Sequence, residues 1–207
     1  MTGLTGAAGA DRPGRAGDKA SHMASGTGTD PDRALLPGEF LLRDGTPAMI
    51  WPLLPTDGET LRDIFRRMSL ESRRQRFLAA IGELDDAMIR RLVHSVDGGR
   101  HVALVLTVLP TDGEEQPVGV ARLLQDPADP ATADIAFAVA DDWHGRGVGA
   151  ALVPALMRRC PPEVRRLRTA VDAGNRASLA LLAGTGRMSS GPAYLGVLDV
   201  MVDLTAA

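Results

Sequence analysis

Apolar residues are spaced in two ways along this chain, and the two spacings predict alternating strands and helices. Nearly continuous apolar runs, the clearest at residues 101–109, are typical of buried strands. Between such runs, apolar residues recur at helical spacing, as Met88, Leu92 and Val93 do, which predicts amphipathic helices. Strands are expected at residues 48–54, 101–109, 117–124, 133–139, 165–171 and 194–204, after a short strand and turn at 41–46. Helices are expected at residues 57–68, from 69, from 84, at 150–159 and at 175–183.

Three of the expected strands follow one another through short connections, which predicts an antiparallel meander. The first of these connections contains Asp112 followed by Gly113, a hairpin turn signal. The second covers only residues 126–130. Beyond this meander, strands alternate with helices, so the fold class is expected to be α/β (α+β).

The first 36 residues differ in composition from the rest of the chain. They are mainly Gly, Ala, Ser, Thr and Asp with almost no apolar content, so burial cannot offset the entropy lost on ordering them. We expect residues 1–36 to be a disordered tail, and residues 21–25 resemble an expression-vector sequence. Residues 37–207 are expected to form a single domain.

Composition and charge exclude several classes of protein. The net charge of −3 argues against a general nucleic-acid binder, which usually has a basic face. No apolar stretch approaches the roughly 20 residues of a membrane helix, and no secretory signal is recognisable at the start. The single cysteine, Cys160, allows no internal disulfide and no cysteine-rich metal site. A cytoplasmic protein without a metal is therefore expected.

A glycine-rich segment between an expected strand and an expected helix predicts an anion site. Backbone N–H groups at the start of a helix lack partners within the helix. Gly147 and Gly149 have no side chains that would hold a phosphate away from them, and Arg146 is expected to add a mobile positive charge. A pyrophosphate is the ligand that this loop favours.

Other phosphate-binding loops match this segment poorly. Gly145, Gly147 and Ala150 fit a Rossmann-type pattern, but that pattern alone is weak. A Rossmann loop follows its strand immediately and belongs to a parallel unit, whereas here several residues precede Gly145 and the strands before it form a meander. A P-loop is excluded because no Gly-Lys-Ser/Thr follows.

The segment His144-Gly145-Arg146-Gly147-Val148-Gly149 resembles the acyl-CoA loop of GNAT acetyltransferases, which reads Gln/Arg-x-x-Gly-x-Gly/Ala after the fourth strand. Further segments resemble the GNAT domains of bacterial Pat-like protein-lysine acetyltransferases. These are residues 42–45, 69–77, 96–97, 101–105 and 126–130. The resemblance covers residues 41–204.

This resemblance implies a GNAT fold, in which a mixed, mostly antiparallel sheet is splayed between its fourth and fifth strands and flanked by helices. It implies acetyl-CoA as co-substrate, with pantetheine in the splay. The implied cofactor-binding residues are Phe137, Ala138, Val139, His144, Gly145, Arg146, Gly147, Val148, Gly149, Ala150 and Asn175.

Acetyl transfer to an amine needs the amine to be neutral, and a base helps because a free lysine amine has a pKa of about 10.4. The Pat-like group has a Glu in the fourth strand for this purpose, and the matching residue is Asp134. The alternative is that Asp134 is only a polar strand-end residue facing solvent. Many family members also have a Tyr that protonates the leaving thiolate, but Leu182 stands at that position. Tyr194, the only tyrosine, is the candidate replacement; otherwise it fills a core edge.

Other chemistry-bearing residues are given structural interpretations. Cys160 is expected at a helix C-terminus, where the helix dipole disfavours a thiolate. The remaining candidates are interpreted as solvated, surface or capping residues. They are Arg73, Arg74 and Arg76, Glu114 and Glu115, and His94 and His101.

The function expected from this resemblance is transfer of acetyl from acetyl-CoA to a primary amine by direct attack, with a protein lysine as acceptor. A small-molecule amine is an alternative acceptor. A weakly active acyl-CoA-binding regulatory module is a second alternative, motivated by Leu182 and by the short side chain of Asp134. A homodimer is a further possible partner arrangement, because an exposed strand edge in this fold often pairs.

Overall fold

The computed structural model of this chain describes residues 38–109 and 114–206. The expected tail at 1–36 and the turn at Asp112 and Gly113 lie outside the described residues. The strands are β1 (Phe40–Leu41), β2 (Pro47–Pro52), β3 (His101–Val108), β4 (Gln116–Gln125), β5 (Thr132–Val139), β6 (Arg166–Asp172), β7 (Arg187–Ser190) and β8 (Val197–Asp203). The helices are α1 (Gly58–Arg66), α2 (Leu70–Phe77), α3 (Asp86–Val93), α4 (Val148–Met157) and α5 (Arg176–Ala183).

In the described part of the chain, eight strands form one sheet in the order β1-β2-β3-β4-β5-β6-β8-β7. Strands β3, β4 and β5 are antiparallel neighbours, so the expected meander is confirmed. Strands β5 and β6 are parallel, and they pair only from Thr132 opposite Arg166 to Asp134 opposite Arg168. Beyond Asp134 the two strands separate, which confirms the mixed sheet and its splay.

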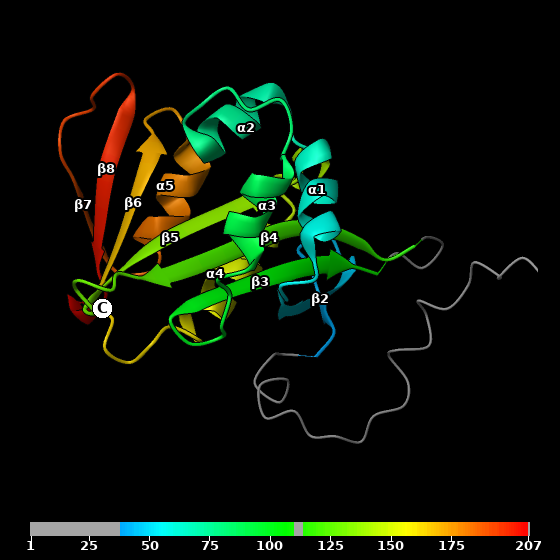
Figure 1. Ribbon diagram of the computed structural model, residues 1–207, viewed down its shortest axis with the longest axis horizontal. Coiled ribbons are helices and arrows are strands. Elements are labelled where there is room, and N and C mark those ends of the chain that lie inside the picture. The colour runs from blue at the N-terminus through cyan, green and yellow to red at the C-terminus, as the bar shows by residue number, and fades with distance from the viewer. Residues whose placement is uncertain (1–37, 110–113, 207) are drawn as a thin grey trace, which may run out of the picture. The chain divides into compact units, whose positions relative to one another are not determined.

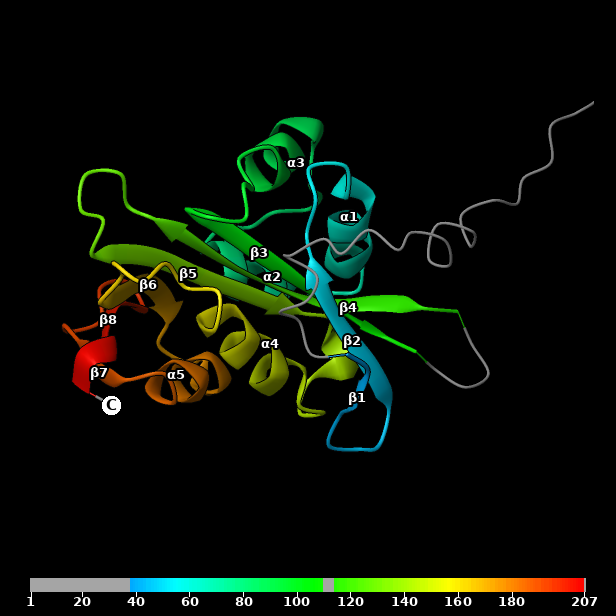
Figure 2. The ribbon, with the colours of Figure 1, turned by 90° about the horizontal axis from the view of Figure 1, so that it is seen from below.

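Helices cover both faces of the sheet, and each face has its own apolar core. Figure 2 shows α1 and α3 on one side of the sheet and α4 and α5 on the other. The first core lies between α4 and the sheet, and it includes the buried residues Leu104 and Leu123. The second lies under α1, α2 and α3 around Ile64 and Phe65. None of the described helices is long and apolar enough to span a membrane.

Helix α4 lies very close to strand β4, and a glycine makes this possible. A Cβ on Gly119 would come within 2.7 Å of a Val148 methyl group and 2.9 Å of a Leu152 methyl group. The absence of a side chain at Gly119 therefore lets the first turn of α4 rest directly on the sheet. That contact positions the loop that precedes α4.

The sequence prediction of strands is incomplete near the C-terminal end of the chain. The strand expected at 194–204 is present as β8, but it pairs antiparallel with β7, which was not expected. Leu195 and Gly196 have φ of 48° and 79°, a left-handed conformation that interrupts an extended strand. Strand β7 was missed because Met188 is its only apolar residue, so it lacks an apolar run.

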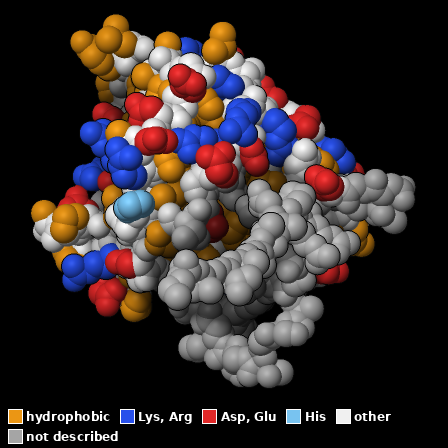
Figure 3. All heavy atoms as spheres, turned by 45° about the vertical axis from the view of Figure 1, so that its right-hand side comes forward, with side chains coloured by type: hydrophobic (Ala, Val, Ile, Leu, Met, Phe, Trp, Pro, Cys, Tyr) orange, Lys and Arg blue, Asp and Glu red, His pale blue; other side chains and the backbone are white. Residues whose placement is uncertain are grey.

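Charged side chains of both signs are interspersed on the face of the molecule in Figure 3. On α1, Arg62 and Arg66 both form ion pairs with Glu59, at 2.8 Å and 3.3 Å. Exposed pairs of this kind contribute little stability individually. The stability of the fold therefore depends mainly on its two apolar cores.

Candidate functional site

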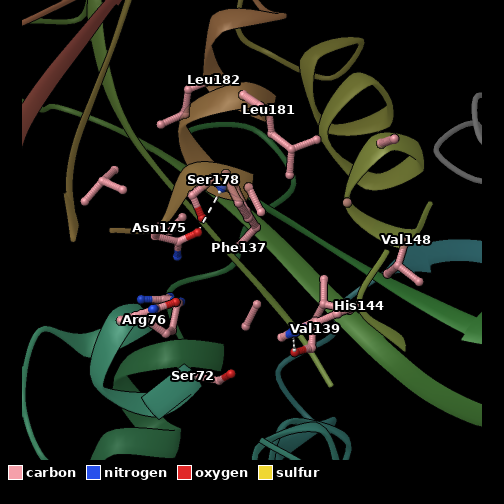
Figure 4. A pocket seen from close by; sticks show the side chains of 18 of the residues that line it. Ser72, Arg76, Phe137, Val139, His144, Val148, Asn175, Ser178, Leu181 and Leu182 are labelled. Atoms are coloured by element: carbon pink, nitrogen blue, oxygen red, sulfur yellow. Dashed lines mark hydrogen bonds between the residues drawn. The ribbon is translucent and has the colours of Figure 1, made fainter. Parts of the chain in front are cut away.

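The splay between β5 and β6 opens into a cavity of about 620 Å³. Its walls come from β5, β6, the loop before α4, helix α5 and, across the opening, helix α2. Figure 1 shows α2 lying over the ends of β5 and β6, and Figure 4 shows the side chains that line the cavity. The cavity is large enough for a cofactor arm to enter between the two strands.

The loop before α4 has the backbone geometry of an anion site. Gly145 and Gly147 have φ of 74° and 99°, values that favour glycine, and Gly147 is the N-cap of α4. Counting from the start of the helix, the first backbone N–H that makes a hydrogen bond is that of Ala151, which donates to the Gly147 carbonyl at 3.0 Å. Among the described residues, the N–H groups of Val148, Gly149 and Ala150 have no acceptor. These residues line the cavity and are suited to receive phosphate oxygens.

All but one of the cofactor-binding residues expected from the sequence line this cavity. They are Phe137, Ala138, Val139, His144, Gly145, Gly147, Val148, Gly149, Ala150 and Asn175. The structure thus brings strand β5, the glycine loop and the start of α5 to one opening. Acetyl-CoA fits this set, because donor N–H groups lie at one end of the cavity and strand backbone lies along its wall.

Arg146 is the exception, and the expectation of a mobile charge there is wrong. Its guanidinium Nε donates to the Asp44 carboxylate, and Nη2 donates to Thr46 Oγ1 at 3.2 Å. The guanidinium also stacks on Trp143, 3.7 Å from the ring centroid. Hydrogen bonds from Thr46 and then Arg146 lower the pKa of Asp44 to about 2. Arg146 therefore fixes the glycine loop to the turn between β1 and β2.

Arg43 supplies a cation at the loop that sequence reasoning did not identify. It lines the cavity, and its Cγ lies 3.1 Å from the position that a Cβ on Gly147 would take. The Arg43 backbone N–H also donates to the Arg146 carbonyl at 3.3 Å. No local signal in the sequence could have found this contact, because the two segments lie far apart along the chain.

Two polar side chains hold the ends of the elements that form the cavity. His144 Nε2 lies 3.1 Å from the Val139 carbonyl oxygen, which ties the loop to the end of β5. Asn175 Oδ1 accepts a hydrogen bond from the Ser178 N–H at 3.0 Å and so caps α5. Figure 4 shows both contacts as dashed lines, with the Asn175 amide nitrogen pointing into the cavity.

Helix α2 is part of the site, although its arginines were expected to form a solvated face. Ser72, Gln75 and Arg76 line the cavity, and Arg74 forms an ion pair with Asp172 at the end of β6, at 2.9 Å. Burial, and then the nearby charge of Arg122, lower the pKa of Arg76 to about 10. The expectation is therefore wrong for Arg76, because helix α2 folds over the sheet and not away from it.

Of the two catalytic candidates, Asp134 lies at the splay and Tyr194 does not. Asp134 is the last β5 residue that pairs with β6. Arg168 holds both carboxylate oxygens, at 3.0 Å and 3.3 Å. Tyr194 is 78% exposed in the turn between β7 and β8 and does not line the cavity. Leu182, at the position of the family tyrosine, is buried and does line it.

The remaining candidates fall outside the cavity. Burial raises the pKa of the Cys160 thiol to about 11, which keeps the thiol protonated. His94 ends α3 as expected, with its N–H donating to the Arg90 carbonyl at 2.9 Å. His101 was expected at the surface, but it is buried, because it begins β3, an interior strand of the sheet that lies between β2 and β4.

Comparison with known proteins agrees with this geometry. The family model described as acetyltransferase (GNAT) family matches residues 60–186. Acetyltransferase PA5475 of Pseudomonas aeruginosa is 32% identical over 146 residues, which are 70% of this chain and 77% of that protein. The chain belongs to the GNAT family of acetyltransferases and is an acyltransferase.

Solved structures show the same fold. The GNAT domain of S. lividans PAT superposes with a TM-score of 0.70 at 24% identity, covering 83% of this chain and 98% of that one. A GCN5-related N-acetyltransferase from Kribbella flavida superposes with a TM-score of 0.57 at 24% identity, covering 74% of this chain and 95% of that one.

Proposed function

We propose that this protein transfers acetyl from acetyl-CoA to a primary amine, and that the amine is the side chain of a protein lysine. The observation that carries the proposal is the glycine loop at the N-terminus of α4, which opens into the cavity at the splay of β5 and β6. As part of the proposal, residues 37–207 act as a single domain in the cytoplasm.

The pyrophosphate is proposed to bind the N–H groups of Val148, Gly149 and Ala150, which have no acceptor among the described residues. Arg43, beside Gly147, would complement its negative charge. The pantetheine arm would follow β5 past Asp134, where the strand no longer pairs with β6. Backbone groups along that edge of β5 need partners, and the amides of pantetheine can provide them.

Acetyl-CoA supplies the acetyl group as a thioester, which an amine nitrogen attacks directly. As the new C–N bond forms, the C–S bond breaks and CoA leaves as a thiolate, which becomes the thiol by taking up the second proton that the amine nitrogen loses. We assign Asp134 to accept the proton of the amine, since it lies where the two strands separate. Tyr194 is the only tyrosine, but its place outside the cavity does not support its proposed role as the acid.

We assign a protein lysine as the acceptor because residues 69–77 and neighbouring segments resemble those of Pat-like enzymes. Thiol release with a lysine peptide, and none with free polyamines or aminoglycosides, is the expected result of an amine screen. Turnover with small amines alone would contradict the lysine assignment. Tight acyl-CoA binding without thiol release for any amine would contradict catalysis and favour the regulatory module.

The loop assignment is tested by adding a charge to Gly145. A Cβ at Gly145 meets nothing within 4 Å, and Asp and Asn both tolerate positive φ. Gly145→Asp and Gly145→Asn therefore differ mainly in charge. Gly147 suits this test less well, because Arg43 occupies the space beside it.

We expect acetyl-CoA and free CoA to raise the thermal midpoint of the wild-type protein. A ligand at 100 times its dissociation constant stabilises by about 2.7 kcal/mol. Gly145→Asp should bind acetyl-CoA at least about tenfold more weakly than Gly145→Asn, because its carboxylate repels the pyrophosphate. Equal affinities in the two variants, or no shift in the wild type, would refute the proposed site.

A further inference from the structure

A second, smaller cavity lies on the α1, α2 and α3 side of the sheet, behind β5. Its volume is about 40 Å³. Ala136, Ala138 and Arg76 line both this cavity and the larger one. The small cavity therefore adjoins the larger cavity along β5, on the face of the sheet opposite α4.

Two arginines, Arg76 from α2 and Arg122 from β4, line this small cavity among apolar side chains. The other lining residues are Leu53, Leu61, Ile64, Phe65, Met68, Phe77, Leu84, Leu92, Ala103, Val120, Ala136 and Ala138. Both guanidinium-bearing side chains line the same small cavity, and the charge of Arg122 lowers the pKa of Arg76.

Neither arginine has a hydrogen-bond or ion-pair partner among the described residues, apart from a contact of Arg76 with an aromatic ring. The Arg76 guanidinium lies 4.9 Å from the Phe77 ring centroid. Asp134 is near enough for its charge to act on Arg122. Its carboxylate, however, is bound by Arg168 at 3.0 Å. The neighbouring arginines of α2 are partnered, since Arg73 donates to the Gly82 carbonyl and Arg74 binds Glu71 and Asp172.

Two adjacent cations in an apolar cavity are unfavourable without a counter-charge. Both arginines are partly buried, and charges that are withdrawn from water in proteins are normally paired or hydrogen-bonded. Burial lowers the pKa of both guanidinium groups, which reflects the same cost. An anion placed between them would relieve the repulsion and accept several N–H donors at once. Arginine is the side chain best suited to bind a carboxylate in this way.

We propose that Arg76 and Arg122 bind a carboxylate that the substrate carries close to the reacting carbonyl. This inference rests on the proposed acetyl-CoA site in the larger cavity. The size of the small cavity favours a carboxylate: about 10–15 Å³ of such space holds one water, so 40 Å³ accommodates roughly three heavy atoms. A carboxylate beside the acceptor amine fits this description, and so does the far end of a short dicarboxylic acyl group on CoA.

The test compares ligands that differ only by a carboxylate, and its two arms distinguish the two sources. In the donor arm, succinyl-CoA is compared with butyryl-CoA by thermal shift. In the acceptor arm, ω-amino acids from glycine to 6-aminohexanoate are compared with their carboxamides in the presence of CoA. We expect at least a tenfold preference for the carboxylate in one arm. That preference should fall to within about twofold in Arg76→Gln and in Arg122→Gln.

Arg91→Gln is the matched control, because Arg91 is exposed on α3 and should retain the wild-type preference. No preference in either arm of the wild type, or a preference unchanged in both Gln variants, would overturn the inference. Normal CoA binding in that case leaves the proposed function intact, whereas absence of any CoA shift would overturn both.

A measurement without ligand tests the same proposal independently. Arg122→Met removes the charge and keeps an unbranched apolar stem. The unliganded variant should therefore melt at a higher temperature than the wild type, because an unpaired cation has been removed from an apolar site. A lower midpoint would show that the guanidinium is already stabilised within the free protein, and would overturn the proposal.

Discussion

Asp134 has two possible roles, and its surroundings define an experiment that separates them. It ends the pairing of β5 with β6, so it lies at the splay, where the proposed acetyl transfer would take place. Arg168 binds both of its oxygens and also contacts Asp126 at 3.3 Å. A structural ion pair and a catalytic base would both place a carboxylate here, but they predict different effects of substitution.

We expect Asp134→Asn to lower the rate of acetyl transfer by about 100-fold, since general base catalysis contributes roughly 10²–10⁴-fold. The measurement is thiol release at saturating acetyl-CoA with the acceptor found in the amine screen. Acetyl-CoA binding should be unchanged.

Asp129→Asn is the control for this experiment, because Asp129 forms a similar ion pair with Arg166 on β6, at 2.9 Å. It should leave the rate near that of the wild type. If both variants retain wild-type turnover, Asp134 is only a structural partner of Arg168.

Helix α2 depends on its ends more than the other helices that surround the site. None of its residues is fully buried, yet it contributes Ser72, Gln75 and Arg76 to the cavity. Its N-cap, Ser69, accepts a hydrogen bond from the Ser72 N–H at 3.1 Å. The Ser69 N–H in turn donates to Asp141 Oδ2 at 3.1 Å. Local capping therefore compensates for the small apolar face of this helix.

Ser69→Ala removes this cap and should cost about 1 kcal/mol. In a chain of this length, that loss corresponds to a fall of about 2–4 °C in the thermal midpoint. Acetyl-CoA affinity should fall in parallel, because α2 forms one wall of the proposed acetyl-CoA site. Ser69→Thr keeps a capping oxygen and should melt close to the wild type. Indistinguishable midpoints for the Ala and Thr variants would mean that the cap does not stabilise α2.

The stability of the whole molecule should depend on pH through the buried His101. It is 2% exposed, its Nδ1 lies 2.8 Å from Ser95 Oγ, and its Nε2 has no partner among the described residues. Burial, and then the charge of Arg122, lower the pKa of His101 below its ordinary 6.5. The unfolded chain therefore binds a proton more readily than the folded one. The stability due to neutral His101 is complete above pH 6.5 and is lost as the pH falls below it.

We expect the free energy of unfolding to fall between pH 7 and pH 5, with a contribution from one histidine of at most about 1.4 kcal/mol per pH unit. Denaturant unfolding across this range provides the measurement. His101→Gln should show a smaller fall, whereas His94→Gln, which changes an exposed residue, should follow the wild type. A His101→Gln curve parallel to that of the wild type would contradict this assignment.

Much of the architecture was predictable from local patterns. Apolar runs and helical spacing predicted the helices, the strands up to β6, and β8, because these signals act within a few residues. The glycine loop was identified for the same reason, since Gly145 and Gly147 are needed for local backbone geometry. The pattern failed at β7, which has little apolar character.

The sequence by itself determined the order of the elements apart from β7, the loop at the start of α4 and the family to which the chain belongs. Tertiary structure alone decided which charges meet: Arg146 with Asp44, Arg43 with the glycine loop, and Arg76 with Arg122. The physical reason is that periodicity reports which face of an element is apolar. It does not report which distant element packs against that face. The packing of that element determines whether a nearby charged side chain is solvated, paired or available to bind a ligand.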